Sequence, residues 1–237
     1  YLPSYSLIRQ ITAVAFISTA TFYLIDGKIR KSYFLTIIGS FFHLSVLLFL
    51  PIILIRKLKV NLLLGIVFLV IFYILVFRLN LANLILDNPL FRESKYGVYN
   101  NYGMFVKQTE LGTGLGVILK LTPSLIYLFI SNIYKDLIKK NPYDLNIINI
   151  INYCFIFSVM LSTQIHIFNR LVDLFIFVPL VTFIALGKIN FNKSNIAMIR
   201  LVFAVPIIIN FVLMIFKNPA SAVGGLGIYP YQSIMGL

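Results

Sequence analysis

Charged residues are scarce in this chain. Asp, Glu, Lys and Arg together make up 11% of its 237 residues, whereas they account for about a quarter of an ordinary soluble domain. Hydrophobic residues reach 60%, so the composition excludes a soluble globular domain and predicts an all-α, polytopic transmembrane helical bundle. The sequence has a single cysteine, Cys154, which can form no internal disulfide.

Motifs for metal and nucleotide chemistry are also missing. The chain has two histidines, His43 and His166, and neither a His-Glu-x-x-His nor an Asp-x-Asp pattern, so no metal and no cofactor are predicted. The glycine cluster from Gly112 to Gly116 lacks the Lys-Ser/Thr ending of a phosphate loop. We therefore expect arginines, rather than a metal, to neutralise any phosphate group that the protein handles.

Basic residues outnumber acidic ones, 20 against 7. A nucleic-acid-binding protein would gather them on one folded face, but most of them lie in short loops between apolar runs, as cytoplasmic tethers of membrane spans do.

The apolar runs predict membrane-embedded segments at residues 7–25, 33–55, 61–77, 118–134, 146–164, 174–186 and 195–216. We expect one transmembrane domain, residues 1–237, with an extracytoplasmic loop at residues 78–120. Because residue 1 is Tyr rather than Met, this domain is expected to be the C-terminal part of a longer chain.

The apolar run at residues 33–55 has two possible paths. It is long enough to cross a membrane once, but Gly39, Ser40 and Pro51 could break it into a re-entrant hairpin with His43 at its tip. Clusters of basic residues flank the run at residues 28–31 and 56–59. A hairpin places both clusters on the cytoplasmic side, as the positive-inside rule favours, whereas a single crossing separates them. We predict the hairpin.

On this topology, His43 and Arg9 face the outer side together with residues 164–170 and the long loop. His43 is an ionisable side chain at hydrocarbon depth, so it needs a partner, a wet cavity or a reaction. A neutral histidine bonded to a neighbouring helix is the structural alternative. Arg9 lies in the first turn of the first predicted span, where it could bind an anion with the helix N-terminus or extend to the lipid headgroups.

Short motifs in a fixed order resemble the EpsG family of Wzy-like exopolysaccharide polymerases. They are Ser6-Leu7-Ile8-Arg9-Gln10, the basic residues before Tyr33, Phe41-Phe42-His43-Leu44-Ser45, Asn169-Arg170-Leu171 and Tyr229-Pro230-Tyr231-Gln232-Ser233. The resemblance covers most of the chain. It implies a metal-independent glycosyltransferase of the bacterial cytoplasmic membrane, which polymerises oligosaccharide repeat units carried on undecaprenyl diphosphate into a surface polysaccharide.

The resemblance also implies roles for individual residues. Arg9 and Arg170 would bind the diphosphate, and His43 would position the acceptor or act as general base. The further candidates are Glu110, His166 and Asp173 for catalysis, Arg92 for the diphosphate, and Gln10, Tyr96 and Asn169 for the sugars. The expected partners are the lipid-linked oligosaccharide and membrane lipid, then a chain-length regulator and a flippase, with no nucleic acid among them.

Two other functions stay open. A transporter or flippase of lipid-linked sugars would use a discontinuous helix such as the predicted hairpin, but transporters favour inverted repeats and this sequence has no internal repeat. A membrane acyltransferase that modifies polysaccharide usually carries denser clusters of histidine and arginine than are found here.

Overall fold

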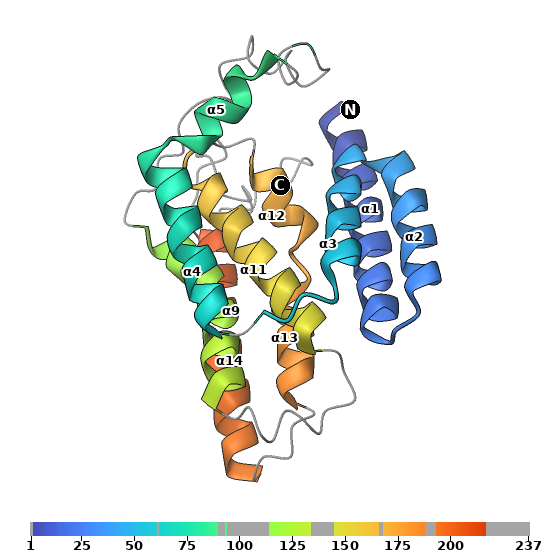
Figure 1. The fold of residues 1–237 in the computed structure, drawn as a ribbon. Helices are drawn as coiled ribbons and strands as arrows, with labels where there is room; N and C mark the ends of the chain where they lie inside the picture. Colours follow the sequence, from blue (N-terminus) through green and yellow to red (C-terminus); the bar gives the residue numbers. More distant parts are fainter. Residues whose placement is uncertain are drawn as a thin grey trace, which may run out of the picture.

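The computed structural model describes residues 2–60, 62–89, 93, 114–133, 145–165, 168–187 and 193–216 of the chain. The elements in these ranges are all helical (Figure 1), which confirms the predicted all-α class. In chain order they are α1 (Leu2–Ile25), α2 (Ile29–Phe42), η1 (Leu44–Leu48), α3 (Phe49–Ile55), α4 (Leu62–Tyr73), η2 (Ile74–Arg78), α5 (Leu81–Asp87), α9 (Leu115–Ile133), α11 (Leu145–Ser162), α12 (Asn169–Leu174), α13 (Val178–Gly187) and α14 (Lys193–Phe216). The described apolar stretches long enough to cross a membrane are Ile8–Ile25, Leu115–Asn132, Leu145–Ser162 and Asn169–Leu186.

α1 and α2 form an antiparallel pair at one side of the molecule (Figure 1). The buried positions of α1 recur every three or four residues, as expected for one face of a helix, at Ala13, Ile17, Ala20 and Leu24. On α2, a Cβ added to Gly39 would lie 3.0 Å from the Cβ of Phe16 on α1. The absent side chain at Gly39 therefore allows the two helices to approach this closely.

The segment from α2 to α3 is a hairpin. α2 ends at Phe42, the backbone is extended at His43, and η1 and α3 then return beside α1 (Figure 1). α2 contains 14 residues, or about 21 Å at the helical rise, which is too short for a hydrocarbon core of about 30 Å. α2 and the returning segment thus form a helical hairpin, as predicted.

Contacts with α11 fix the base of this hairpin. The side-chain oxygen of Asn146, at the start of α11, accepts from the backbone N–H of Val60 at 2.9 Å, and its Nδ2 donates to the carbonyl of Arg56 at 2.8 Å. The turns at residues 26–28 and 56–60 consequently lie at the same end of the bundle (Figure 1), which we call the basic end. The opposite end, where the hairpin tip lies, is called the site end.

The helix break falls at the predicted tip residue, His43, and not at Gly39, Ser40 or Pro51. Gly39 and Ser40 lie inside α2. Pro51 lies in the first turn of α3, where proline is tolerated because the N–H groups of a first turn have no intrahelical partner. The break occurs at His43, whose backbone has φ −150° and ψ 121°.

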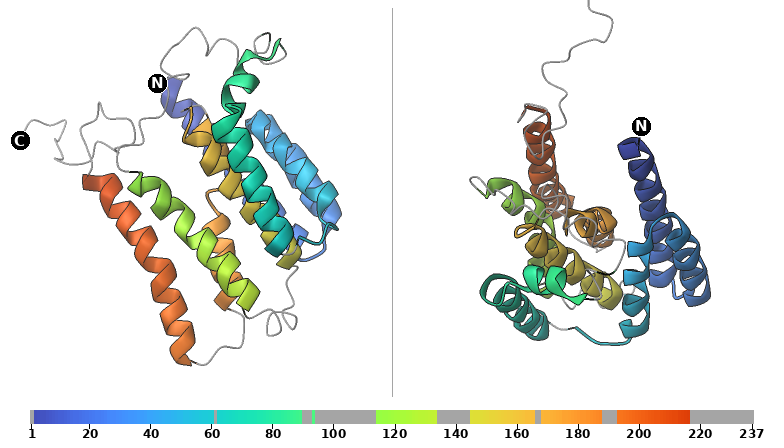
Figure 2. Two further views of the ribbon diagram at one scale, coloured as in Figure 1. Left: turned by 60° about the vertical axis from the view of Figure 1, so that its left-hand side comes forward. Right: turned by 90° about the horizontal axis from the view of Figure 1, so that it is seen from above.

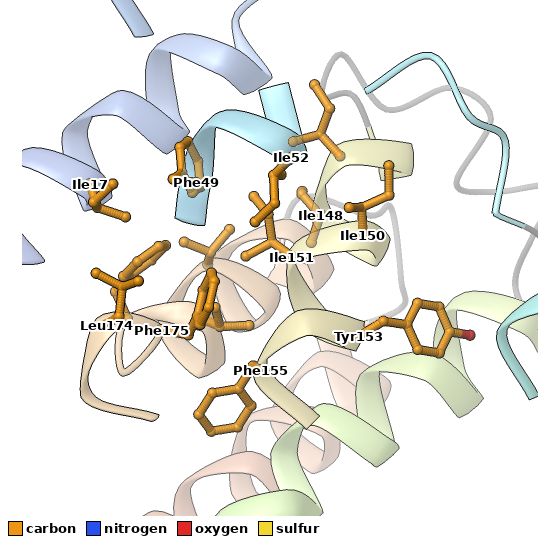
Figure 3. Packing of buried hydrophobic residues seen from close by; sticks show 14 of the residues in the cluster. Ile17, Phe49, Ile52, Ile148, Ile150, Ile151, Tyr153, Phe155, Leu174 and Phe175 are labelled. Atoms are coloured by element: carbon orange, nitrogen blue, oxygen red, sulfur yellow. The ribbon is translucent and has the colours of Figure 1, made fainter. Parts of the chain in front are cut away.

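α11 lies among the other helices and is buried on most of its surface, as a helix that is apolar all round should be. Figure 3 shows its residues Ile148, Ile151 and Phe155 beside Phe49 of α3 and Phe175 after α12. This cluster joins the hairpin to the rest of the bundle. It therefore holds α12 and the hairpin tip in one packed unit.

The predicted outer loop at residues 78–120 is partly helical. α4 ends in a π-helical turn, η2, to which the Gln164 amide is tied by donating to the Val76 carbonyl. α5 follows η2 and extends past the bundle at the site end (Figure 2). α9 begins at Leu115 rather than at the predicted residue 118.

Candidate functional site at the hairpin tip

The hairpin tip is a single residue, His43. Its Nδ1 accepts a hydrogen bond from the backbone N–H of Ser45 at 3.3 Å, and the Ser45 hydroxyl oxygen lies 2.6 Å from the same nitrogen. The side chain therefore caps the start of η1 by pairing an N–H group that a helix start leaves without a partner. The imidazole is partly buried.

Arg9 reaches the hairpin tip from α1. Its Nε donates to the carbonyl of Phe42 at 3.2 Å, so the guanidinium pairs a carbonyl at the C-terminal end of α2, where a positive charge is favourable. The rings of Phe42 and Phe16 stack with centroids 5.5 Å apart. These two contacts fix the end of α2 against α1, immediately before His43.

The position of Arg9 in its helix differs from the expectation. α1 begins at Leu2, so Arg9 lies about two turns inside the helix rather than in its first turn. The free N–H groups of the helix start are therefore too far away to form an anion site with it. Arg9 contributes to the site through its guanidinium group.

Arg170 lies on the short helix α12, at the site end of the bundle. α12 is held by the buried side chains of Val172 and Leu174, while Asn169 and Arg170 are only partly buried. Arg170 and Arg9 both lie within electrostatic range of the His43 imidazole. The structure thus brings together three side chains that are distant in the sequence. Residues 9 and 43 are 34 positions apart, and residues 43 and 170 are 127 positions apart.

A polar contact joins α1 directly to α12. The side-chain amide of Gln10 donates to Oδ2 of Asp173 at 2.9 Å. Gln10 follows Arg9 on α1, and Asp173 follows Arg170 by one turn of α12. This bond therefore links the two helices that carry the arginines.

The remaining candidates lie outside the described residues. They are Glu110, His166, Arg92 and Tyr96. Asn169, predicted to contact sugars, is the first residue of α12 beside Arg170. Of the ten candidate residues, the structure therefore gathers Arg9, Gln10, His43, Asn169, Arg170 and Asp173 at the site end.

One residue with a direct contact at the site had no predicted role. Ser45 was part of the motif around His43, but nothing indicated that it would bind the imidazole. The signal was the spacing, because a cap side chain pairs with the N–H group two or three residues later. That spacing is informative only if the helix restarts after His43.

The chemistry available at this site is recognition of an anion. The Arg9 guanidinium contacts the hairpin tip, both arginines lie within electrostatic range of the His43 imidazole, and planar guanidinium groups suit phosphate oxygens. In the described ranges Arg9 forms its side-chain hydrogen bond through Nε, and no hydrogen bond of its two terminal nitrogens is seen in the same ranges. Within the same ranges, no three His, Cys, Asp or Glu side chains gather in a way that could hold a metal ion.

These features define the class of protein. It is an all-α membrane protein with a helical hairpin, whose tip contacts Arg9 and lies within electrostatic range of Arg170. The chain belongs to the EpsG family, whose profile matches residues 1–233. No curated protein and no solved structure matches the chain. Family membership gives it a polysaccharide polymerase-like role in the membrane, as an enzyme of the polymerase or glycosyltransferase type.

Proposed function

We propose that this protein polymerises oligosaccharide repeat units carried on undecaprenyl diphosphate, at the outer side of the bacterial cytoplasmic membrane. The observation that carries the proposal is the convergence of Arg9, His43 and Arg170 at the hairpin tip. A lipid diphosphate is a membrane-anchored anion, and this site offers it positive charge at the edge of an apolar bundle. The site end would face outward, with the basic end in the cytoplasm.

In the proposed reaction, a sugar hydroxyl of one lipid-linked unit attacks the anomeric carbon of a second, lipid-linked chain. The new glycosidic C–O bond forms as the anomeric C–O bond to the diphosphate breaks, and the lipid diphosphate leaves with the bonding electrons. Negative charge therefore develops on the leaving diphosphate, where preorganised donors stabilise a transition state most. Arg9 and Arg170 supply that stabilisation in this proposal, in place of a metal ion.

The geometry of Arg9 supports this role. Its Nε is engaged by the Phe42 carbonyl, so the two terminal nitrogens form the fork that would face two phosphate oxygens. Because Nε is fixed, the fork is held in place before substrate arrives. Preorganisation of this kind lowers the cost of ordering a long side chain on binding.

The neighbouring polar residues complete the proposal. Asp173 is a carboxylate at the same end of the bundle and would take the proton from the attacking hydroxyl. Gln10 and Asn169 would contact sugar hydroxyls beside the arginines, and the outer segment would add Arg92, Tyr96, Glu110 and His166. Chain-length regulation and flipping of the units would require separate partner proteins.

The test is an analysis of lipid-linked intermediates in a deletion strain that carries single variants. Arg170→Ala is expected to keep the protein in the membrane, while single lipid-linked units accumulate and long polymer disappears. Removing one donor to a developing anion costs about 10²- to 10³-fold in rate. Long polymer at the normal level in Arg170→Ala would refute the proposal.

Arg30→Ala is the matched control. Arg30 is an exposed arginine in the first turn of α2, at the basic end of the same hairpin unit. Its loss removes the same charge from the protein without touching the site. Polymer length in this variant is expected to equal that of the unmodified protein.

The same experiment separates polymerisation from transport. The discontinuous helix at His43 is also a feature of transporter sites. A failed polymerase leaves single units on the outer leaflet, where an impermeant glycan-modifying reagent reaches them. A failed flippase leaves them on the cytoplasmic leaflet, protected from that reagent.

A further inference from the structure

We propose that His43 acts as a hydrogen-bond donor through its Nε2–H to the leaving diphosphate, and that Ser45 is the positioning residue that fixes this tautomer. The inference rests on the proposed function for the identity of the anion. The inference goes beyond the proposed function because it assigns His43 a proton that stays on the ring. A histidine with that proton cannot act as the general base.

The tautomer of His43 follows from a hydrogen-bond donor that cannot act as an acceptor. The backbone N–H of Ser45 points at Nδ1 of His43 with a distance of 3.3 Å, and a backbone N–H can only donate. Nδ1 must therefore present its lone pair. In a neutral imidazole one nitrogen accepts and the other carries the proton, so the proton lies on Nε2.

The Ser45 hydroxyl strengthens the same assignment. Its oxygen lies 2.6 Å from Nδ1, and with the lone pair of Nδ1 directed at residue 45 the hydroxyl is the donor. A proton on Nδ1 would face the backbone N–H of the same residue, placing two donors against each other. Ser45 thus favours one tautomer by two contacts from one residue.

The ring is also fixed in space. Its backbone follows Phe42, whose carbonyl is held by Arg9 and whose ring stacks on Phe16. Nε2 lies on the side of the ring away from Ser45 and makes no hydrogen bond to any residue in the described ranges. The Nε2–H group is therefore directed away from the cap, with Arg9 and Arg170 as the charged groups that act on the ring.

In the reaction, the donor to the leaving diphosphate and the general base are therefore two different residues. A general base at Nε2 needs a lone pair there, hence a proton on Nδ1, which the Ser45 N–H opposes. A donor at Nε2 adds a third positive or partly positive group beside the two arginines, where the leaving diphosphate gains charge. The hydroxyl proton then goes to another group, which in the proposed function is Asp173, the carboxylate that accepts from Gln10.

A pair of substitutions at His43 separates donor from base. The Gln side chain places an amide N–H near the position of Nε2 but has no basic nitrogen. We expect His43→Gln to retain polymerisation at about 10-fold or more above His43→Ala, measured as polymer formed from purified lipid-linked units. Equal loss of activity in the two variants would overturn the donor assignment.

Nuclear magnetic resonance gives a readout that needs no activity. The chain has two histidines, so selective ¹⁵N-histidine labelling of the full chain in lipid gives two ring systems, and a His166→Gln variant assigns that of His43. We expect a protonated Nε2 and an unprotonated Nδ1. A proton on Nδ1 would overturn the proposal, whatever reaction the protein catalyses.

Substitutions at Ser45 test the positioning role. Ser45→Ala removes the hydroxyl but keeps the backbone N–H, so we expect about a 3- to 10-fold loss of polymerisation rate, with unchanged half-saturation by substrate. Ser45→Thr restores the hydroxyl and should recover the rate. A merely structural role would give the same loss in both variants; that result, or no loss in Ser45→Ala, would overturn the positioning role. If Arg170→Ala leaves polymer unchanged, the proposed function fails, while the tautomer assignment is still judged by the spectrum.

Discussion

Gly39→Ala is the substitution that most directly tests how the fold positions the site. A Cβ at residue 39 would lie 3.0 Å from the Cβ of Phe16 and 3.2 Å from Cγ1 of Val46. The Cβ of Phe16 is fixed by the backbone of α1, so it cannot rotate away. α1 and α2 must therefore separate by a few tenths of an ångström, three residues before Phe42 and four before His43.

The expected loss of stability is small because two effects oppose each other. Overpacking at a tight contact costs about 1–3 kcal/mol, whereas replacing a glycine inside a helix by alanine gains about 1 kcal/mol. The net change is a destabilisation of about 0–2 kcal/mol. The variant should therefore remain folded, with its melting temperature in detergent lowered by a few degrees at about 2–4 °C per kcal/mol.

Activity should fall more than stability. Separation of α1 from α2 moves Phe42 away from Arg9 and tilts the tip that carries His43. Because a displacement of about 1 Å in a catalytic arrangement can cost about 10²-fold in rate, a shift of a few tenths predicts a loss of about 10-fold. The assay is polymer formation from purified lipid-linked units, with the melting temperature measured on the same preparation.

Gly116→Ala is the matched control. A Cβ at residue 116 would meet no atom of the described residues within 4 Å, and Gly116 is likewise helical, in the first turn of α9. It should leave the rate unchanged and the stability equal or slightly higher. If Gly39→Ala behaves in the same way, the close contact does not hold the hairpin tip and the reasoning is refuted.

Three further predictions concern contacts between helices of the bundle. Gly65→Ala should strongly lower the melting temperature, because the added Cβ would lie 1.7 Å from the Tyr153 hydroxyl oxygen. Tyr153→Ala should then lower the stability of the Gly65→Ala variant by less than it lowers the stability of the unmodified protein. Equal losses in the two backgrounds would contradict this contact. Asn146→Ala should lower stability by about 1–3 kcal/mol, since two backbone groups of the turn after α3 lose their partner, while the rate per folded molecule stays unchanged; a lower rate without lower stability would argue against a purely structural role. Gln10→Ala and Asp173→Ala should show a coupling of about 0.5–1.5 kcal/mol in a double-mutant stability cycle, and strict additivity would mean that the bond between them contributes nothing.

Much of the fold is predictable from the sequence because membrane spans are specified by composition and length. The runs at residues 146–164 and 195–216 match α11 and α14 closely. Even the hairpin was predictable, since two basic clusters on either side of one apolar run favour the same side of the membrane. The short helix α5 was not, because seven residues make only about two helical turns, too few to give a clear periodic signal.

The position of the helix break shows the limit of local rules. Glycine and proline are the usual signals of a break, yet Gly39 serves close packing and Pro51 fits the first turn of α3. His43 ends α2 because Arg9 pairs the Phe42 carbonyl and Ser45 pairs the imidazole. The Arg9 contact comes from another helix and leaves no mark in the sequence of the hairpin.

From chemistry and the family motifs, the sequence predicted that Arg9, His43 and Arg170 share one side of the molecule, but not how they contact their neighbours. The structure places Arg9 on the Phe42 carbonyl and both arginines within electrostatic range of the His43 imidazole, while their roles stay predictions. The bond from Gln10 to Asp173 joins residues 163 positions apart. Such a pair becomes visible only when the packing of α1 against α12 is known.

The Arg9 contact has a thermodynamic consequence. One guanidinium pairs the end of α2 through Nε and, in the proposed function, a phosphate through its terminal nitrogens. A ligand held by that fork and an intact hairpin then stabilise each other, because a ligand that prefers the folded arrangement raises its stability by mass action. Substrate binding would tighten the tip that it requires, and an empty site would be the state in which the hairpin opens most readily.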